Sequence, residues 1–265
     1  MIARLSVSVV IPALRGGHFL RQALASVLRQ DYEPLDIWVV DNGSSDDVRE
    51  VALAHGESVR LLVEKCRGAA HARNCAIRQS GGDLLAFLDD DDLWTAGHLH
   101  RMAEILAADS GLGIAQGRIR NFRHLADGRP FYCSPAYQFS ALSSAVYRRW
   151  VFDQVGFFDG SLMFGEDTDY CIRCWEKGIR KITAEPISVL YRRHGGNMTA
   201  NKNLQELGVV KVFKRRLDRK RQGLDVDALP PAGLRDYLGE PPEAYDTGRY
   251  EEMDEETLSY LSTGS

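Results

Sequence analysis

The sequence predicts an α/β fold: a doubly wound, mostly parallel sheet, then a smaller mixed region and a helical, acidic C-terminal tail. Short β-branched apolar runs alternate with helical patterns over the first hundred residues. The connections between them are short, which favours neighbouring parallel strands. Polar segments follow several of the runs, and in such sheets ligands bind beyond the carboxyl ends of the strands.

The first half supplies the regular part of this pattern. Short apolar runs bounded by turn residues predict buried strands, at residues 7–11, 37–40, 59–63 and 84–88. Apolar residues at helical spacing, or a capping residue followed by such spacing, predict helices at residues 19–28, 46–55 and 69–79.

The pattern becomes mixed from about Gly113. Shorter strands are expected at residues 114–122, 142–147, 181–183 and 187–192, with a helix at 165–177. We therefore divide the chain into two halves of one domain, a helix and a tail, with bounds 1–112, 113–203, 204–223 and 224–265.

The C-terminal region changes composition abruptly. Residues 204–221 predict an amphipathic helix with seven basic residues in its second half. Residues 224–265 hold eleven Asp and Glu against two Arg, a net charge of -9, so the rest of the chain carries +5. Two Pro-Pro pairs favour a tail over a folded continuation. Near-helical spacing from Tyr250 to Leu261 leaves three outcomes open: docking on the body or a second subunit, disorder, or contact with a partner such as the acceptor's carrier.

Composition excludes several classes of protein. A formal net charge of -4 over 265 residues does not suggest a nucleic-acid-binding protein. Five cysteines do not suggest a secreted disulfide framework, and we interpret Cys171 and Cys174 as two small residues on one helix face. The N-terminal residues lack a signal-peptide pattern, and no run approaches the roughly 20 apolar residues that span a bilayer. We expect a cytoplasmic protein that reaches any membrane substrate peripherally, at the inner face.

An acidic run within Phe87-Leu88-Asp89-Asp90-Asp91-Asp92-Leu93-Trp94 gives the sharpest chemical signal. Four adjacent carboxylates at the end of a buried strand repel one another unless a cation or ligand hydroxyls compensate them. Hard oxygen ligands indicate Mg²⁺ or Mn²⁺. The alternative is a solvated turn in which Asp92 caps the next helix.

Two further segments carry candidate chemistry. Acidic residues in Gly165-Glu166-Asp167-Thr168-Asp169 open a predicted helix, where they could favour the helix dipole or supply a general base. A histidine within Tyr191-Arg192-Arg193-His194-Gly195-Gly196-Asn197 could contact phosphate or metal, or be a surface residue.

Together these motifs make the chain resemble the inverting glycosyltransferases of family 2, which have the GT-A fold. The features that carry the resemblance occur in the family's order over roughly residues 5–200. They include Val9-Val10-Ile11-Pro12-Ala13, Val39-Val40-Asp41-Asn42-Gly43-Ser44-Ser45-Asp46, Gly68-Ala69-Ala70-His71-Ala72-Arg73-Asn74 and the three acidic or histidine segments above. The resemblance implies a nucleotide-sugar-binding first half and an acceptor-binding, catalytic second half.

The resemblance implies a nucleotide pocket in the first half. The backbone of Pro12, Ala13 and Leu14 would line it. Asp41 would accept from the N3–H of uracil, and Arg73 would contact the base or its edge, so UDP is the favoured nucleotide diphosphate. Leu14-Arg15 departs from the aromatic-polar pair usual in the family, which affects how the base would stack.

The resemblance also implies roles for the acidic and histidine segments. Asp89 and Asp90 would face the ribose and diphosphate, while Asp91 would bind Mn²⁺ or Mg²⁺. His194 matches a position that approaches the metal or diphosphate.

For the transfer itself, Asp167 matches the family's base, with Glu166 beside it as an orienting or acceptor-binding group. The Gln-x-x-Arg-Trp motif of processive synthases is absent, which favours transfer of a single sugar to an acceptor that the sequence does not identify. A sugar nucleotidyltransferase, a haloacid-dehalogenase-like phosphatase and a non-catalytic protein of the same fold are the alternatives. The first would want a Gly-rich basic loop after the first strand, and the second an Asp-x-Asp-x-Thr motif.

Overall fold

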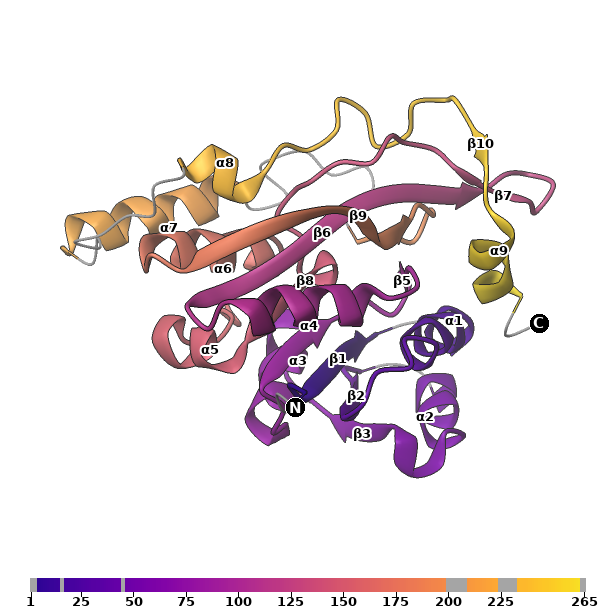
Figure 1. Cartoon of the computed structure of the whole chain (residues 1–265), viewed down its shortest axis with the longest axis horizontal. Helices are drawn as coiled ribbons and strands as arrows, with labels where there is room; N and C mark the ends of the chain where they lie inside the picture. Colours follow the sequence, from indigo (N-terminus) through magenta and orange to yellow (C-terminus); the bar gives the residue numbers. More distant parts are fainter. Residues whose placement is uncertain (1–3, 15–16, 44–45, 199–208, 224–232, 263–265) are drawn as a thin grey trace.

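The computed structural model describes residues 4–14, 17–43, 46–198, 209–223 and 233–262. Its described strands form one mixed sheet whose main path runs β10-β7-β6-β8-β4-β1-β2-β3 (Figure 1). The parallel part contains the four strands expected in the first half: β1 (Val7–Ala13), β2 (Leu35–Asp41), β3 (Arg60–Val63) and β4 (Leu84–Phe87). The predicted α/β class is confirmed.

Helices cover both faces of this sheet, because successive side chains of a strand point to opposite sides. From β1, Val9 and Ile11 pack in one core cluster, while Val10 packs in the other. The first cluster is covered by α1 (Gly17–Leu28), α2 (Asp46–Leu53) and α4 (His98–Ala108). The second is covered by α3 (Ala69–Gln79), α5 (Arg149–Val155) and α6 (Glu166–Glu176). Of these, α5 was not predicted, and α4 was expected only as a helix of unstated bounds after the acidic run.

The second half is built on two long parallel strands, β6 (Leu112–His124) and β9 (Arg180–Arg192). The prediction of two separate strands at 181–183 and 187–192 is wrong, since β9 is continuous. Its pairing shifts between Gln116–Thr183 and Arg118–Ile187, so β9 carries extra residues around Pro186 without leaving the sheet. Two short strands, β7 (Pro130–Tyr132) and β8 (Ala145–Arg148), complete this half, and β5 (Leu93–Trp94) of the first half pairs with β9.

The C-terminal region contains α7 (Val209–Arg221), α8 (Leu234–Leu238), β10 (Glu251–Glu252) and α9 (Glu255–Leu261). The predicted helix agrees with α7 where it is described, and its first residues, 204–208, lie outside the described chain, as do 224–232 of the tail. The expectation that the tail is not a folded continuation is wrong for residues 233–262.

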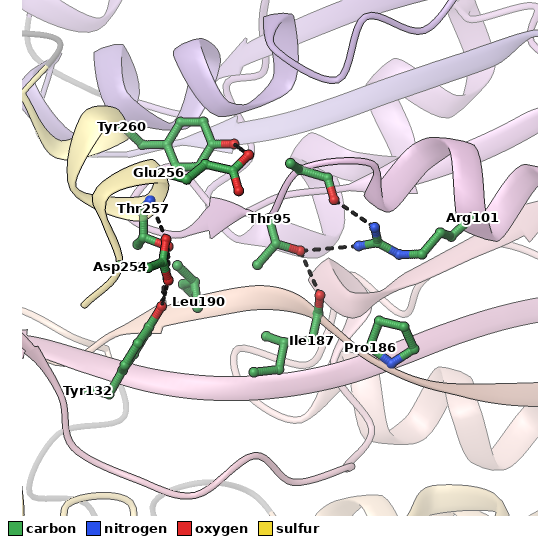
Figure 2. Close-up of a pocket in the computed structure, with 11 residues that line it drawn as sticks. Thr95, Arg101, Tyr132, Pro186, Ile187, Leu190, Asp254, Glu256, Thr257 and Tyr260 are labelled. Atoms are coloured by element: carbon green, nitrogen blue, oxygen red, sulfur yellow. Dashed lines mark hydrogen bonds between the residues drawn. The ribbon is translucent and has the colours of Figure 1, made fainter. Parts of the chain in front are cut away.

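Apolar residues set between the acidic ones hold this segment on the chain's own body. Met253 and Tyr260 pack with Leu93 and Phe122, and β10 pairs with β7. Asp254 caps α9 by accepting from the Thr257 amide at 2.8 Å, and it also accepts from the Tyr132 hydroxyl at 2.8 Å (Figure 2). Docking on the body is thus the outcome among the three expected for this segment, while assembly through it stays a prediction.

Within the described parts of the chain, every helix is too short or too polar to cross a bilayer. All five cysteines are free thiols. Cys171 and Cys174 lie buried on α6 as small core residues, as predicted.

Candidate active site

The carboxyl ends of β1 and β2 bring the predicted nucleotide-binding segments together. Pro12 and Ala13 end β1, and Ala13 lies in register with Asp41 at the end of β2. The Asn42 amide donates to the Ala13 carbonyl at 2.9 Å, and Asp41 accepts from the Gly43 amide at 3.1 Å. Leu14 follows β1, and its amide donates to Asp90 at 3.1 Å. The acidic run thus lies beside the end of β1.

The four adjacent carboxylates coexist because each has a different partner. Asp90 is engaged by the backbone amide of Leu14, and Asp89 by the guanidinium of Arg73 at 2.6 Å. Partial burial raises the pKa of Asp89, although Arg73 opposes the rise. The remaining two, Asp91 and Asp92, meet the end of β9.

Asp92 lies behind the site rather than in it. Its side chain is fully buried and accepts from the Arg192 amide at 2.9 Å. Burial holds its pKa well above the ordinary range, and the carboxylates of Asp91 and Asp89 add to the rise. The interpretation of Asp92 as a helix cap is wrong, because α4 begins after Gly97 and Asp92 is used to fix the end of β9.

Asp91 and His194 form the candidate metal centre. Nε2 of His194 lies 2.9 Å from Oδ2 of Asp91, and both side chains are about one quarter exposed. Asn197 holds the histidine segment by accepting from the His194 amide at 2.7 Å. Among the described residues, three or more His, Cys, Asp or Glu side chains do not gather at any point to hold an ion.

A carboxylate and an imidazole nonetheless fit a divalent ion that takes its remaining ligands from a diphosphate and water. The imidazole favours Mn²⁺ over Mg²⁺, because Mg²⁺ prefers oxygen ligands. The residues present therefore suit a metal that is held jointly by the protein and its substrate.

The buried Arg192 holds the backbone of this centre in place, a role that the sequence analysis missed. It is 1% exposed, its Nε donates to the Asp91 carbonyl at 2.7 Å, and its Nη2 donates to Gln22 at 2.7 Å. Burial lowers its pKa to about 10. Its place at the end of a strand beside His194 was the available signal, but Gln22 lies 170 residues away in the sequence.

Arg73 joins the two halves of the site. Its Nη2 donates to Asp89 at 2.6 Å and its Nη1 donates to Glu166 at 2.7 Å, while its side chain is 5% exposed. Both terminal nitrogens are therefore engaged by carboxylates. The contact with a nucleotide base expected for Arg73 stays a prediction.

Asp167 follows Glu166 in the first turn of α6, which begins after Gly165 in a left-handed conformation. Burial, and then the neighbouring Glu166 carboxylate, raise the pKa of Asp167 to about 7. The Thr168 amide donates to Asp167 at 2.6 Å and orients it. A carboxylate with a pKa near neutrality is suited to accept a proton from a substrate hydroxyl.

A separate cavity of about 260 Å³ lies under α9 (Figure 2). It is lined by Thr95, Arg101, Tyr132, Leu190 and Tyr260, among others, and by none of the residues predicted for the donor site. This cavity is therefore separate from the candidate donor site at the strand ends.

Residues 8–170 match the family model described as Glycosyl transferase family 2. The chain belongs to this family. It is therefore a glycosyltransferase, and the expectation drawn from the motifs is confirmed. The match contains the predicted residues up to Asp167, while His194 lies beyond it.

Relatives of this glycosyltransferase have named activities in some cases. The uncharacterized glycosyltransferase YwdF of Bacillus subtilis is 27% identical over 89% of this chain and 91% of its own length. WfgD of Escherichia coli, named a UDP-Glc:alpha-D-GlcNAc-diphosphoundecaprenol beta-1,3-glucosyltransferase, is 36% identical over 38% of this chain and 40% of its own. WfaP of the same species, with the same activity in its name, is 25% identical over 74% and 80%.

Solved structures share the fold. The mannosyltransferase PcManGT from Pyrobaculum calidifontis, in complex with GDP-Man and Mn²⁺, has a TM-score of 0.65 at 21% identity, covering 87% of this chain and 67% of that one. TarS 1-349 of S. aureus, in complex with UDP-GlcNAc, has a TM-score of 0.62 at 17% identity, covering 75% and 62%. At these identities the likeness shows the fold alone.

Proposed function

We propose that this glycosyltransferase moves a single sugar from a UDP-sugar to an acceptor hydroxyl, with inversion and with a divalent metal bound. The observation that carries the proposal is the bridge made by Arg73, which joins Asp89 on the donor side to Glu166 on the acceptor side. The next residue after Glu166 is Asp167, whose burial raises its pKa to about 7, which supports a role for it as the base.

The donor side rests on the first half of the chain together with His194 of the second half. Asp91 and His194 would hold a divalent ion, which when bound supplies positive charge to the leaving diphosphate. Asp89 and Asp90 stay anchored by Arg73 and the Leu14 amide, so they present fixed oxygen atoms to the ribose and diphosphate. The UDP-Glc in the names of two relatives and the UDP-GlcNAc bound to TarS support UDP, while the GDP-Man bound to PcManGT makes GDP the nucleotide to test against it.

On the acceptor side, Asp167 takes the proton of the acceptor hydroxyl. The hydroxyl oxygen forms a bond to the anomeric carbon as the bond from that carbon to the diphosphate oxygen breaks on the opposite face. The diphosphate leaves with the electron pair, and the configuration at the anomeric carbon inverts. A positioned base of this kind contributes about 10²–10⁴-fold to the rate.

Family membership favours sugar transfer over nucleotidyl transfer. A donor-hydrolysis assay separates sugar transfer from a non-catalytic role. The test is calorimetric UDP and GDP affinity with Mn²⁺ and then with excess chelator. We expect Mn²⁺ to be required, because the diphosphate and the acidic run repel each other without a cation.

Two variants sharpen the test. Asp91→Asn should weaken UDP binding only when Mn²⁺ is present, whereas Asp153→Asn, an exposed carboxylate on α5, should bind as the unaltered chain does. Equal UDP affinity with metal and with chelator would contradict the metal centre. If GDP bound more tightly than UDP, GDP would replace UDP as the assigned nucleotide.

A further inference from the structure

The helix α7 meets the rest of the molecule along one side. Val212 is its one buried residue, and it packs with Leu162, Ile172 and Leu238. Arg219 lies near the same side and donates to Asp169 at 3.1 Å. The helix is therefore fixed to the body, and its outer side is a definite surface.

The outer side carries an apolar stripe, consisting of Val210, Phe213 and Leu217. Their exposed fractions are 67%, 42% and 52%. Spacings of three and four residues place them in one row on the helix, opposite Val212. Three neighbouring exposed apolar side chains on one helix are more than the scattered single residues that protein surfaces normally show.

The cations of α7 divide between its two sides. Arg215, Arg216 and Arg219 form ion pairs with carboxylates of the body. Beside the stripe, Lys214 and Lys220 are exposed, and the ion pairs identified in the described chain include neither of them. The exposed Arg221 lies 3.5 Å from Asp218 of the same helix. The row of apolar side chains is thus flanked by positive charge.

The densest acidic stretch of the C-terminal segment, residues 251–256, lies away from this charge. The exposed carboxylates of Glu251, Glu252, Glu255 and Glu256 belong to β10 and α9. Those elements lie at the opposite end of the molecule from α7 (Figure 1). Near α7, the short helix α8 carries an exposed Asp236, whereas α7 itself exposes Lys214, Lys220 and Arg221.

We propose that the outer side of α7 binds the surface of an anionic lipid membrane. An exposed apolar row flanked by Lys and Arg is the pattern with which interfacial helices insert apolar side chains at the headgroup boundary. The lysines would meet anionic headgroups, while the acidic end of the molecule would be repelled from them. The contact therefore also sets the orientation of the molecule on the membrane.

The helix α7 is joined by ion pairs to residues near the candidate active site. Arg215 pairs with Asp159, which precedes α6 in the chain, and Arg219 pairs with Asp169, two residues after Asp167. A membrane bound by α7 would lie on a helix that directly contacts the helix bearing the proposed base.

The test is flotation of the full chain with phosphatidylcholine vesicles that contain or lack phosphatidylglycerol. One variant removes the apolar contact, Phe213→Ser with Leu217→Ser, and its control is Leu53→Ser on α2, where Leu53 is 62% exposed. The other removes charge, Lys214→Gln with Lys220→Gln. Its control is Arg21→Gln with Arg49→Gln, two exposed cations on α1 and α2.

We expect binding to vesicles with phosphatidylglycerol and weak binding to vesicles without it. Each lysine near an anionic surface contributes about fivefold, so the charge variant should lose about 25-fold in affinity. The apolar variant should lose about tenfold or more, and the controls should bind like the unaltered chain. All altered side chains are exposed, so every variant should keep the fold. Urea unfolding of each variant checks this.

The proposal would be overturned if the unaltered chain did not float with the vesicles. It would also be overturned if the α7 variants bound the vesicles as tightly as the unaltered chain does. The unaltered chain could instead form a dimer that Phe213→Ser with Leu217→Ser dissociates while vesicle binding stays unchanged. That result would assign the stripe to self-association. None of these readouts uses sugar transfer, so they are independent of the proposed function.

Discussion

Replacing Asp167 by Asn should abolish most transfer and at the same time stabilise the protein above neutral pH. The variant keeps the size of the side chain and its acceptor for the Thr168 amide, but it cannot take a proton from an acceptor. We expect transfer to fall by about 10²–10⁴-fold. UDP and metal binding should be unchanged, because Asp91 and His194 remain.

The gain in stability follows from the pKa of Asp167, which burial and Glu166 raise from 3.8 to about 7. For a carboxyl whose folded pKa is raised, the contribution to stability is complete below the unfolded pKa and is lost as pH rises through the folded value. Three pKa units correspond to about 4 kcal/mol, an upper bound. Because water still reaches part of this side chain, we expect about 2–3 kcal/mol at about pH 8.

The assay is urea unfolding of the unaltered chain and the variant at about pH 4 and about pH 8, with Asp153→Asn as control. The difference in unfolding free energy should be near zero at the lower pH and should favour Asp167→Asn at the higher one. Transfer at a near-normal rate would remove Asp167 as the base, and Asp169 or Glu166 would be tested next. A difference that does not change with pH would refute the argument from burial.

Three further predictions follow from the same contacts. Transfer by the unaltered chain should fall about tenfold per pH unit below about 7, as Asp167 becomes protonated, and a flat pH–rate profile would count against this. Replacing Arg73 by Ala leaves Asp89 and Glu166 without their shared cation and should cost at most about 3–5 kcal/mol of unfolding free energy, because Asp89 is 42% exposed. Arg73→Lys should cost less than Arg73→Ala. Deleting residues 225–265 should spare metal-dependent donor hydrolysis but lower the unfolding midpoint, because Met253 and Tyr260 leave Leu93 and Phe122 exposed. Loss of hydrolysis in a folded truncated chain would show that this segment belongs to the site.

The parallel half of the fold could be predicted because its signals are local. Each of its strands contains a short apolar run, β1, β2 and β4 are covered by helices on both faces, and the predicted helix at residues 69–79 agrees with α3 at both ends. In contrast, β9 has a partly exposed sequence with a proline inside it, so its continuity depends on the pairing with β6, which periodicity does not reveal.

The same distinction applies to the site. The positions of the acidic run and of Asp41 followed from the rule that ligands meet strand ends. The partners of those residues did not follow, because Arg73 meets Glu166 across 93 residues and Asp92 meets the amide of Arg192 across 100. The tail was misjudged because net charge averages over a segment, whereas docking depends on a few side chains such as Tyr237 and Met253.

The contacts of Arg192 with Asp91 and Asp92 make the donor site depend on two segments that lie far apart in the chain. The acidic run is synthesised about a hundred residues before the strand that completes it. His194 follows the end of β9, so a fragment ending before residue 192 would lack the pair of Asp91 and His194. Ligands that bind only the complete chain stabilise it by mass action. A rise in melting temperature with UDP and Mn²⁺ would therefore report whether β9 is in place, and a truncated or misassembled product would show no such rise.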